Sequence, residues 1–245
     1  MATWRDVLTR KLTEHSYLLA ADIAALARLP DTTRSIKPNE DIVRQGDKPD
    51  VSVVVLEGML ARYHTLRGGG RQYLSLHIAG DMPDAQALFL ERMDHALCAL
   101  DHAFIALVPH TTLLKVFEQR PTLGFAIWRE TLIDAAIFRQ AITNNSARSL
   151  PARLAHFFCE QYYRARAAGL TKSGSCSLPL TQTQIGETVG ASLPSISRTL
   201  QALRTTDCVE VRAGRLHIHE WARLVELGEF DPGYLHLIKR IGALK

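Results

Sequence analysis

The consecutive stretches LTQTQIGETVG and ASLPSISRTLQALR most constrain how this chain folds. Thr181 and Gln184 have the spacing of a capping box, which predicts a short helix that ends at Gly190. Ser192 and Pro194 predict the start of a second helix, because serine favours the cap position and proline is tolerated in the first turn. Two helices therefore meet across a tight turn.

The second helix has an apolar face and a polar face. Apolar residues recur at spacings of four and three at Ile196, Leu200 and Leu203. Gly186 is small enough for the first helix to approach the second closely. The pattern is typical of a helix-turn-helix, whose second helix enters the DNA major groove. An ordinary pair of antiparallel core helices is the alternative on these residues alone.

The next stretch, CVEVRAGRLHIHEW, predicts a β-hairpin. Apolar and polar residues alternate on both sides of a two-residue turn, Ala213-Gly214. Arg212 and Arg215 flank the tip, where they can contact phosphate. Two helices followed by a basic hairpin describe a winged helix, and this order favours DNA binding.

Length and composition favour two globular domains. The chain has 245 residues, of which 47% are apolar, and it holds no run near the ~18 apolar residues of a membrane-spanning helix. Its first residues lack the apolar centre of a secretory signal, so we expect a cytoplasmic protein without membrane partners.

Charge and cysteine content agree with this interpretation. Residues 1–149 hold 17 Lys/Arg and 17 Asp/Glu, whereas residues 150–245 hold 12 and 8 and thus supply the whole net charge of +4. The basic excess lies in the half with the helix-turn-helix. The cysteines form no CxxC pair, so we expect reduced structural thiols, with one redox-sensing cysteine as the alternative: Cys98, Cys159, Cys176 and Cys208.

The first half of the chain is predicted to begin with a helical segment at about residues 4–29 and to continue with β-strands. VSVVVLEG, RQYLSLHIAG and HAFIALVPH are punctuated by glycines between about residues 32 and 108. Several short strands at regular spacing predict an antiparallel barrel or jelly roll.

IKPNEDIVRQGD, VVVLEGML and the AGD at residues 79–81 resemble the cyclic-nucleotide-binding β-roll. With the winged helix, the chain resembles the Crp/Fnr family of bacterial transcription regulators over about residues 20–220. The resemblance implies an α+β fold: an N-terminal antiparallel, jelly-roll-like β-roll in residues 1–120, a dimerisation helix and hinge in 121–149, and a winged helix-turn-helix with a C-terminal extension in 150–245.

The family's long helix matches PTLGFAIWRETLIDAAIFRQAITNNS, which Pro121 can start. A heptad-like stripe, interrupted by Arg139, is expected to pair two subunits: Phe125, Trp128, Leu132, Ala135 and Ile142. The stripe could instead pack only on its own β-roll. The chain is expected to pass through a hinge at 144–150 into a helix that starts around Pro151.

The resemblance also implies which residues meet DNA. The family segment that matches Leu193 to Arg198 faces the bases, and Arg198 occupies the place of an arginine suited to guanine. Pro194 stands where the family commonly has a base-reading glutamate, which leaves the operator sequence open. The expected contacts are Thr181, Gln182, Ser192, Pro194, Ser195, Ser197, Arg198, Gln201, Arg212 and Arg215.

The sensory domain departs from the family pattern. Binding cyclic AMP in the usual way needs a glutamate and an arginine, and the matching positions read Asp84-Ala85 and Asp94-His95-Ala96. A carboxylate in place of the cation would repel phosphate. Arg92 could compensate if it faced the same way as Asp94 on a strand. The candidate effector pocket is therefore empty or holds another effector: Asp84, Ala85, Arg92, Asp94 and His95.

The predicted function is a dimeric regulator that binds two-fold symmetric double-stranded DNA and, if it is an activator, RNA polymerase. No cofactor or metal is expected, and the small-molecule effector is unknown. One alternative is a ligand-free regulator whose roll docks a partner. A cupin-type metal enzyme is another, which we disfavour because the first-half histidines form no HxH pair: His64, His77, His95, His102 and His110. The HxH at His217 and His219 lies in the hairpin.

Overall fold

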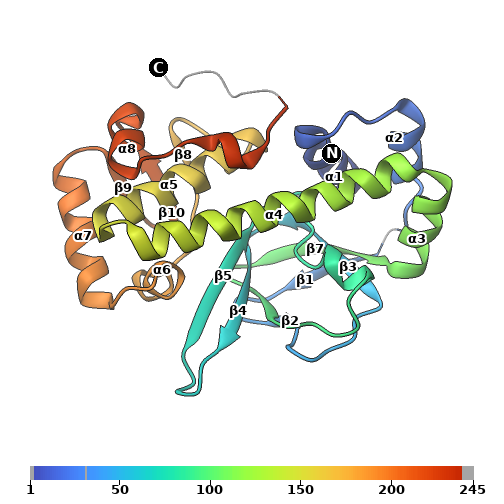
Figure 1. The fold of residues 1–245 in the computed structure, drawn as a ribbon, viewed down its shortest axis with the longest axis horizontal. Helices are drawn as coiled ribbons and strands as arrows, with labels where there is room; N and C mark the ends of the chain where they lie inside the picture. The colour runs from blue at the N-terminus through green and yellow to red at the C-terminus, as the bar shows by residue number, and fades with distance from the viewer. Residues whose placement is uncertain (1–2, 31, 239–245) are drawn as a thin grey trace. The chain divides into compact units, whose positions relative to one another are not determined.

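The computed structural model describes residues 3–30 and 32–238. It divides into two compact units (Figure 1): the first runs to Ala135, and the second starts at Ala136 and also includes Arg71–Tyr73. The first unit begins with helices α1 (Trp4–His15) and α2 (Ala20–Leu26). It ends with α3 (His110–Gln119) and the first half of the long helix α4 (Pro121–Ala147).

Two antiparallel sheets form the body of the first unit. One has the strand order β1-β7-β3, and the other has the order β2-β6-β4-β5. The bounds are β1 (Thr33–Ile36), β2 (Asp41–Val43), β3 (Val51–Glu57), β4 (Leu60–Thr65), β5 (Arg71–His77), β6 (Ala96–Ala99) and β7 (Ala103–Pro109), with a short 3-10 helix η1 (Ala85–Leu88). The predicted fold class, an antiparallel roll followed by a long helix, is confirmed.

Strand β3 explains why its sequence, VSVVVLE, is apolar at successive positions. Val53 and Val55 point into a core that they share with Ile105, between the two sheets. Val54 points the other way, into a second core with Leu12 and other residues of the helices. Because both faces of β3 are covered, strict alternation of apolar and polar residues is not required.

The second unit follows the order expected of a winged helix. Its elements are α5 (Leu150–Ala167), β8 (Ser175–Ser177), α6 (Gln182–Val189), α7 (Leu193–Thr205), β9 (Val209–Arg212), β10 (Arg215–Ile218), α8 (Trp221–Gly228) and the 3-10 helix η2 (Pro232–Leu235). The sequence patterns did not indicate β8, which pairs with β10 to complete a three-stranded sheet.

The break between α4 and α5 is shorter than the predicted hinge. Residues 144–147 are helical, and only residues 148 and 149 separate α4 from α5. Asn144 belongs to the last turns of α4, where its Nδ2 donates to the carbonyl of Arg153 at 3.1 Å. This bond ties the end of α4 to the first turn of α5.

Among the helices of residues 3–30 and 32–238, none is both long enough and apolar enough to cross a bilayer.

Candidate nucleic-acid interface and sensory domain

Helix α6 begins with the predicted capping box. The backbone N–H of Thr181 donates to Oε1 of Gln184 at 2.9 Å, and the backbone N–H of Gln184 donates to Oγ1 of Thr181 at 3.2 Å. These reciprocal bonds satisfy two backbone donors at the helix end. The helix ends at Gly190, whose φ of 70° is a left-handed conformation that glycine adopts without strain.

Gly186 allows α6 and α7 to come close together. A Cβ atom at this position would lie 2.5 Å from the carbonyl oxygen of Ala191, in the turn between the helices. No side chain fits in that space, so the turn requires glycine here. The expected close approach of the two helices is confirmed.

Helix α7 buries one face and exposes the other. Ile196 and Leu203 are buried, whereas a contiguous set on the other side is exposed: Leu193, Pro194, Ser197, Arg198 and Gln201. Ser192 takes the N-cap position as predicted, but its side chain makes no capping bond. Its hydroxyl lies 3.0 Å from the hydroxyl of Ser195 instead.

The hairpin β9–β10 brings two arginines together. Ala213 and Gly214 form its turn with φ of 50° and 71°, which matches the twist of the strands. Arg212 and Arg215 are directly opposite each other across the hairpin. Like charges in this position repel, and a bound anion would relieve the repulsion. Arg215 also donates to Oγ of Ser175 on β8 at 2.9 Å, whereas Arg212 is exposed.

A groove of about 320 Å³ runs between α7 and β9. Ser197 and Gln201 are among its lining residues, so their side chains border the hairpin. Arg204 also lines it and forms an ion pair with Glu210 of β9, with Nε and Oε1 3.4 Å apart. Arg198 is not part of this groove and projects from the exposed face of α7.

The predicted stripe on α4 is uncovered in the single chain. Phe125, Trp128, Leu132 and Ile142 are 62%, 58%, 49% and 69% exposed, and Ala135 is half-buried. The buried face of the first half of α4 is formed by other residues, among them Leu123 and Ile127. Phe125, Trp128 and Leu132 lie within two turns of one another in the first unit, so they form a larger apolar patch than isolated surface residues make.

An apolar groove of about 660 Å³ adjoins this stripe in the first unit. Its lining includes Phe125 and Trp128 of α4 and the exposed Phe89 and Leu90 after η1. The exposed apolar surface therefore extends from α4 onto the roll.

The interior of the roll holds Asp84, one of the predicted effector-pocket residues. Asp84 is fully buried, and its Oδ1 accepts a hydrogen bond from the backbone N–H of Val53 at 2.8 Å. Burial raises the pKa of Asp84 to about 7, although the Val53 bond and the charge of Arg62 oppose the shift. Its neighbour Ala85 is also buried.

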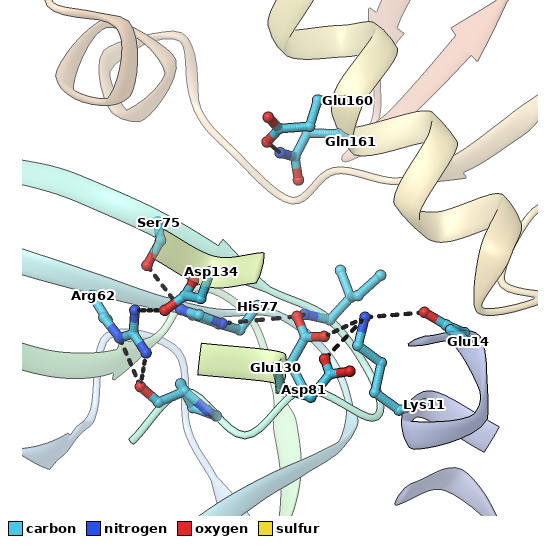
Figure 2. A network of polar contacts seen from close by, with 12 residues as sticks. Lys11, Glu14, Arg62, Ser75, His77, Asp81, Glu130, Asp134, Glu160 and Gln161 are labelled. Atoms are coloured by element: carbon cyan, nitrogen blue, oxygen red, sulfur yellow. Dashed lines mark hydrogen bonds and ion pairs between the residues drawn. The ribbon is translucent and has the colours of Figure 1, made fainter. Parts of the chain in front are cut away.

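Arg62 on β4 is a buried cation that the sequence analysis missed. Its Nε donates to the carbonyl oxygen of Pro83 at 2.7 Å, and its guanidinium forms an ion pair with Asp134 of α4 (Figure 2). Asp134 is 72 residues away in the chain, so sequence spacing could not indicate the pair. The available signal was a lone arginine within the apolar strand LARYHT.

Three other predicted pocket residues, Arg92, Asp94 and His95, precede β6. Arg92 and Asp94 are both exposed and neither lies on a strand, so the condition under which Arg92 could compensate for Asp94 is not met. Arg92 donates to the carbonyl of Gly46 at 2.9 Å, which holds its guanidinium at the loop before β3. His95 is buried, and its Nδ1 lies 2.7 Å from Oδ1 of Asp94. Burial, assisted by the charge of Arg62, lowers the pKa of His95.

A second buried ion-pair cluster surrounds Lys11 of α1 (Figure 2). Its Nζ lies 3.0 Å from Glu14, 3.2 Å from Asp81 and 3.9 Å from Glu130 of α4. Gly80 allows this contact, because its φ is +100° and a Cβ atom there would lie 2.7 Å from Cβ of Lys11. Lys11 of α1 thus links the Gly-Asp turn to α4.

Residues 3–30 and 32–238 contain no group of three or more His, Cys, Asp or Glu side chains that could hold a metal ion. All four cysteines are buried and free. Burial raises the pKa of Cys159 and raises that of Cys176 to about 12, which disfavours the reactive thiolate.

Comparisons with known proteins agree with these two units. A cyclic nucleotide-binding domain model matches residues 33–120, and a Crp-like helix-turn-helix domain model matches residues 152–227. The two domains in this order define a DNA-binding transcription regulator. The chain belongs to the Crp/Fnr family of such regulators.

Several relatives are similar along most of their length. Transcriptional activator protein Anr of Pseudomonas protegens is 22% identical, over 84% of each chain. The anaerobic regulatory protein of Aggregatibacter actinomycetemcomitans is 22% identical, over 89% of this chain and 84% of the relative. The structure of FixK2 from Bradyrhizobium japonicum has a TM-score of 0.72 and 23% identity, covering 81% of this chain and 98% of FixK2, and shares its fold.

Asp84→Asn tests the buried carboxyl group. Because Asp84 keeps its proton up to about pH 7 in the folded chain and only to about pH 4 when unfolded, the folded state binds more protons between these values. Wild-type stability therefore falls as pH rises through this window. Asparagine keeps the acceptor for Val53 and cannot ionise, so we expect the variant to gain stability relative to wild type from pH 4 to 7 and no further above it.

Urea unfolding at four pH values between 4 and 8 measures this difference. Asp207→Asn, at an exposed position, is the matched control and is expected to follow the wild-type profile. A pH-independent difference between Asp84→Asn and wild type would contradict the raised pKa.

Proposed function

We propose that the chain is a homodimeric, sequence-specific DNA-binding regulator whose sensory domain does not bind cyclic AMP in the family's usual way. In this proposal residues 1–120 are the sensory roll, residues 121–149 the dimerisation helix and hinge, and residues 150–245 the DNA-binding domain. RNA polymerase is a partner if the protein is an activator. The exposed face of α7 is the observation that carries the proposal.

The DNA interface combines α7, the start of α6 and the hairpin. The N-terminal residues of a recognition helix meet base edges, and the exposed Arg198 projects from this part of α7. Thr181 and Gln182 at the start of α6 are exposed. In a helix-turn-helix the first helix crosses the phosphate backbone, so these two side chains are candidates for phosphate contacts. Arg212 and Arg215 add two cations opposite each other, suited to phosphate.

Dimerisation is supported by the stripe of exposed apolar residues on α4. Burying them would remove a large apolar surface from water at about 25 cal/mol per Å². Trp128 is 58% exposed and also lines the adjoining apolar groove, so a second copy of α4 could cover both. The alternative that the stripe packs on its own roll is disfavoured by this exposure.

The sensory proposal depends on the charges within the roll and at its surface near His95. Asp84 is buried, Asp94 is exposed beside His95, and the guanidinium of Arg62 is paired with Asp134. An anionic phosphate in the interior would need a cation of its own. The roll then holds a different effector or serves as a ligand-free module that docks a partner.

Arg198→Ala separates base reading from phosphate binding. Loss of a bidentate contact to guanine is expected to cost about 1 to 3 kcal/mol per half-site and to relax preference at one base pair. Titrations of specific and random duplexes over a range of salt concentrations measure both effects. Arg204→Ala is the matched control, because Arg204 is exposed on the same helix but pairs with Glu210.

The hairpin arginines are expected to behave differently from Arg198. Arg212→Ala should weaken binding to all sequences alike and lower the salt slope by about one, as for a phosphate contact. Arg215→Ala should do the same and also lose its bond to Ser175. An equal loss on specific and random DNA for Arg198→Ala would assign that residue to phosphate.

Trp128→Glu tests dimerisation. A charge within the apolar stripe would be buried without a partner in the dimer, so we expect the variant to be monomeric at micromolar concentration. Sedimentation equilibrium distinguishes the 27.3 kDa chain from its dimer. Leu114→Glu, at an exposed position on α3, is the control and should leave the dimer intact. A monomeric wild type that binds one half-site as tightly as the full site would contradict the proposal.

Cyclic nucleotide binding is tested by isothermal titration with cyclic AMP and cyclic GMP. We expect no binding at micromolar concentrations, because the positions that match the family's cation and ribose ligand hold Asp94 and Ala85. Low-micromolar binding that is lost in Arg92→Ala would overturn this expectation. It would show that Arg92 leaves the carbonyl of Gly46 to hold the phosphate.

A further inference from the structure

The first turn of α7 presents an apolar tip. Leu193 is 47% exposed and Pro194 is exposed beside it, at the first two positions of the helix. The two nearest hydroxyls, on Ser192 and Ser195, lie 3.0 Å apart and bond to each other. The first turn also contains no acidic residue. Its most projecting side chains are therefore apolar.

Pro194 of this tip lies on the face of α7 that also carries Arg198, and Leu193 lies at the edge of that face. At 3.6 residues per turn, Pro194 and Arg198 are one turn apart on the same side of the helix. The buried residues Ile196 and Leu203 lie on the opposite side. One helical turn rises about 5.4 Å, whereas stacked base pairs are about 3.4 Å apart, so the two positions reach base pairs one or two steps apart.

The major groove offers one apolar group to such a tip. The C5 methyl group of thymine is the apolar feature on a base edge, whereas the other distinguishing groups are hydrogen-bond donors and acceptors. A proline side chain can neither donate nor accept. It therefore cannot select cytosine through its N4 amino group, as a carboxylate would. Leucine and proline can instead bury a methyl group.

We propose that Leu193 and Pro194 read a thymine methyl group one or two base pairs from the guanine bound by Arg198. This inference rests on the DNA binding proposed above. It assigns the base preference at the position where a glutamate commonly stands in the family, and it makes the first turn of α7 a hydrophobic reader.

Replacing thymine by deoxyuridine tests the proposal, because it removes the methyl group and leaves base pairing intact. The probe is a duplex enriched by the wild-type protein from random sequences, with each thymine changed to deoxyuridine in turn. We expect one thymine per half-site to be sensitive, with an affinity loss of about fourfold per half-site when its methyl group is removed. Leu193→Ala and Pro194→Ala should bind the thymine and deoxyuridine duplexes with more similar affinity.

The control variant is Thr205→Ala, at an exposed position near the far end of α7, which should keep the full difference between thymine and deoxyuridine. Pro194→Glu should change the base enriched at the sensitive position, because it supplies an acceptor. Sequence-specific binding with no sensitive thymine would overturn the inference and leave the proposed function intact. Failure to enrich any sequence would refute both.

Discussion

The orientation of the first half of α4 against the rest of the first unit depends on buried ion pairs. Arg62 pairs with Asp134, and Lys11 pairs with Asp81 and lies within 3.9 Å of Glu130. Removing one partner of such a buried pair typically costs about 3 to 5 kcal/mol, because the other charge remains without compensation. Glu130 and Asp134 are one turn apart, so together they fix which face of α4 turns inward. Phe125, Trp128 and Leu132 lie on the other side of α4, where they are exposed and where Phe125 and Trp128 also line the apolar groove beside the roll.

The second unit depends on close backbone packing rather than on buried charge. At Gly186, the backbone of the turn after α6 comes so close that no side chain would fit. At Gly228, α8 comes equally close to α5, because a Cβ atom there would lie 2.5 Å from the backbone nitrogen of His156. The first contact sets the approach of α7 to α6, and the second sets the approach of α8 to α5. The side chains on the exposed face of α7 do not pack in the core, so substitutions at these positions are expected to leave the fold unchanged.

Local patterns predicted much of this structure and long-range contacts accounted for the rest. The capping box of Thr181 and Gln184, the left-handed Gly190 and the Ala213-Gly214 turn each depend on residues close in sequence, and all were predictable. The Arg62–Asp134 pair and the strand β8 depend on partners far along the chain, which spacing cannot reveal. The bond from Arg92 to the carbonyl of Gly46 joins residues 46 apart in the chain, so spacing could not reveal it either. Each site residue's role in binding remains a prediction, since surface exposure alone does not identify a ligand.

The most direct test of the account is native mass spectrometry of the wild-type protein with an enriched duplex, in the absence of cyclic nucleotide. The account predicts a complex of one duplex with two chains of 27.3 kDa each, because one α7 from each chain occupies one half-site. A complex with a single chain, or one that forms only when cyclic AMP is added, would contradict it.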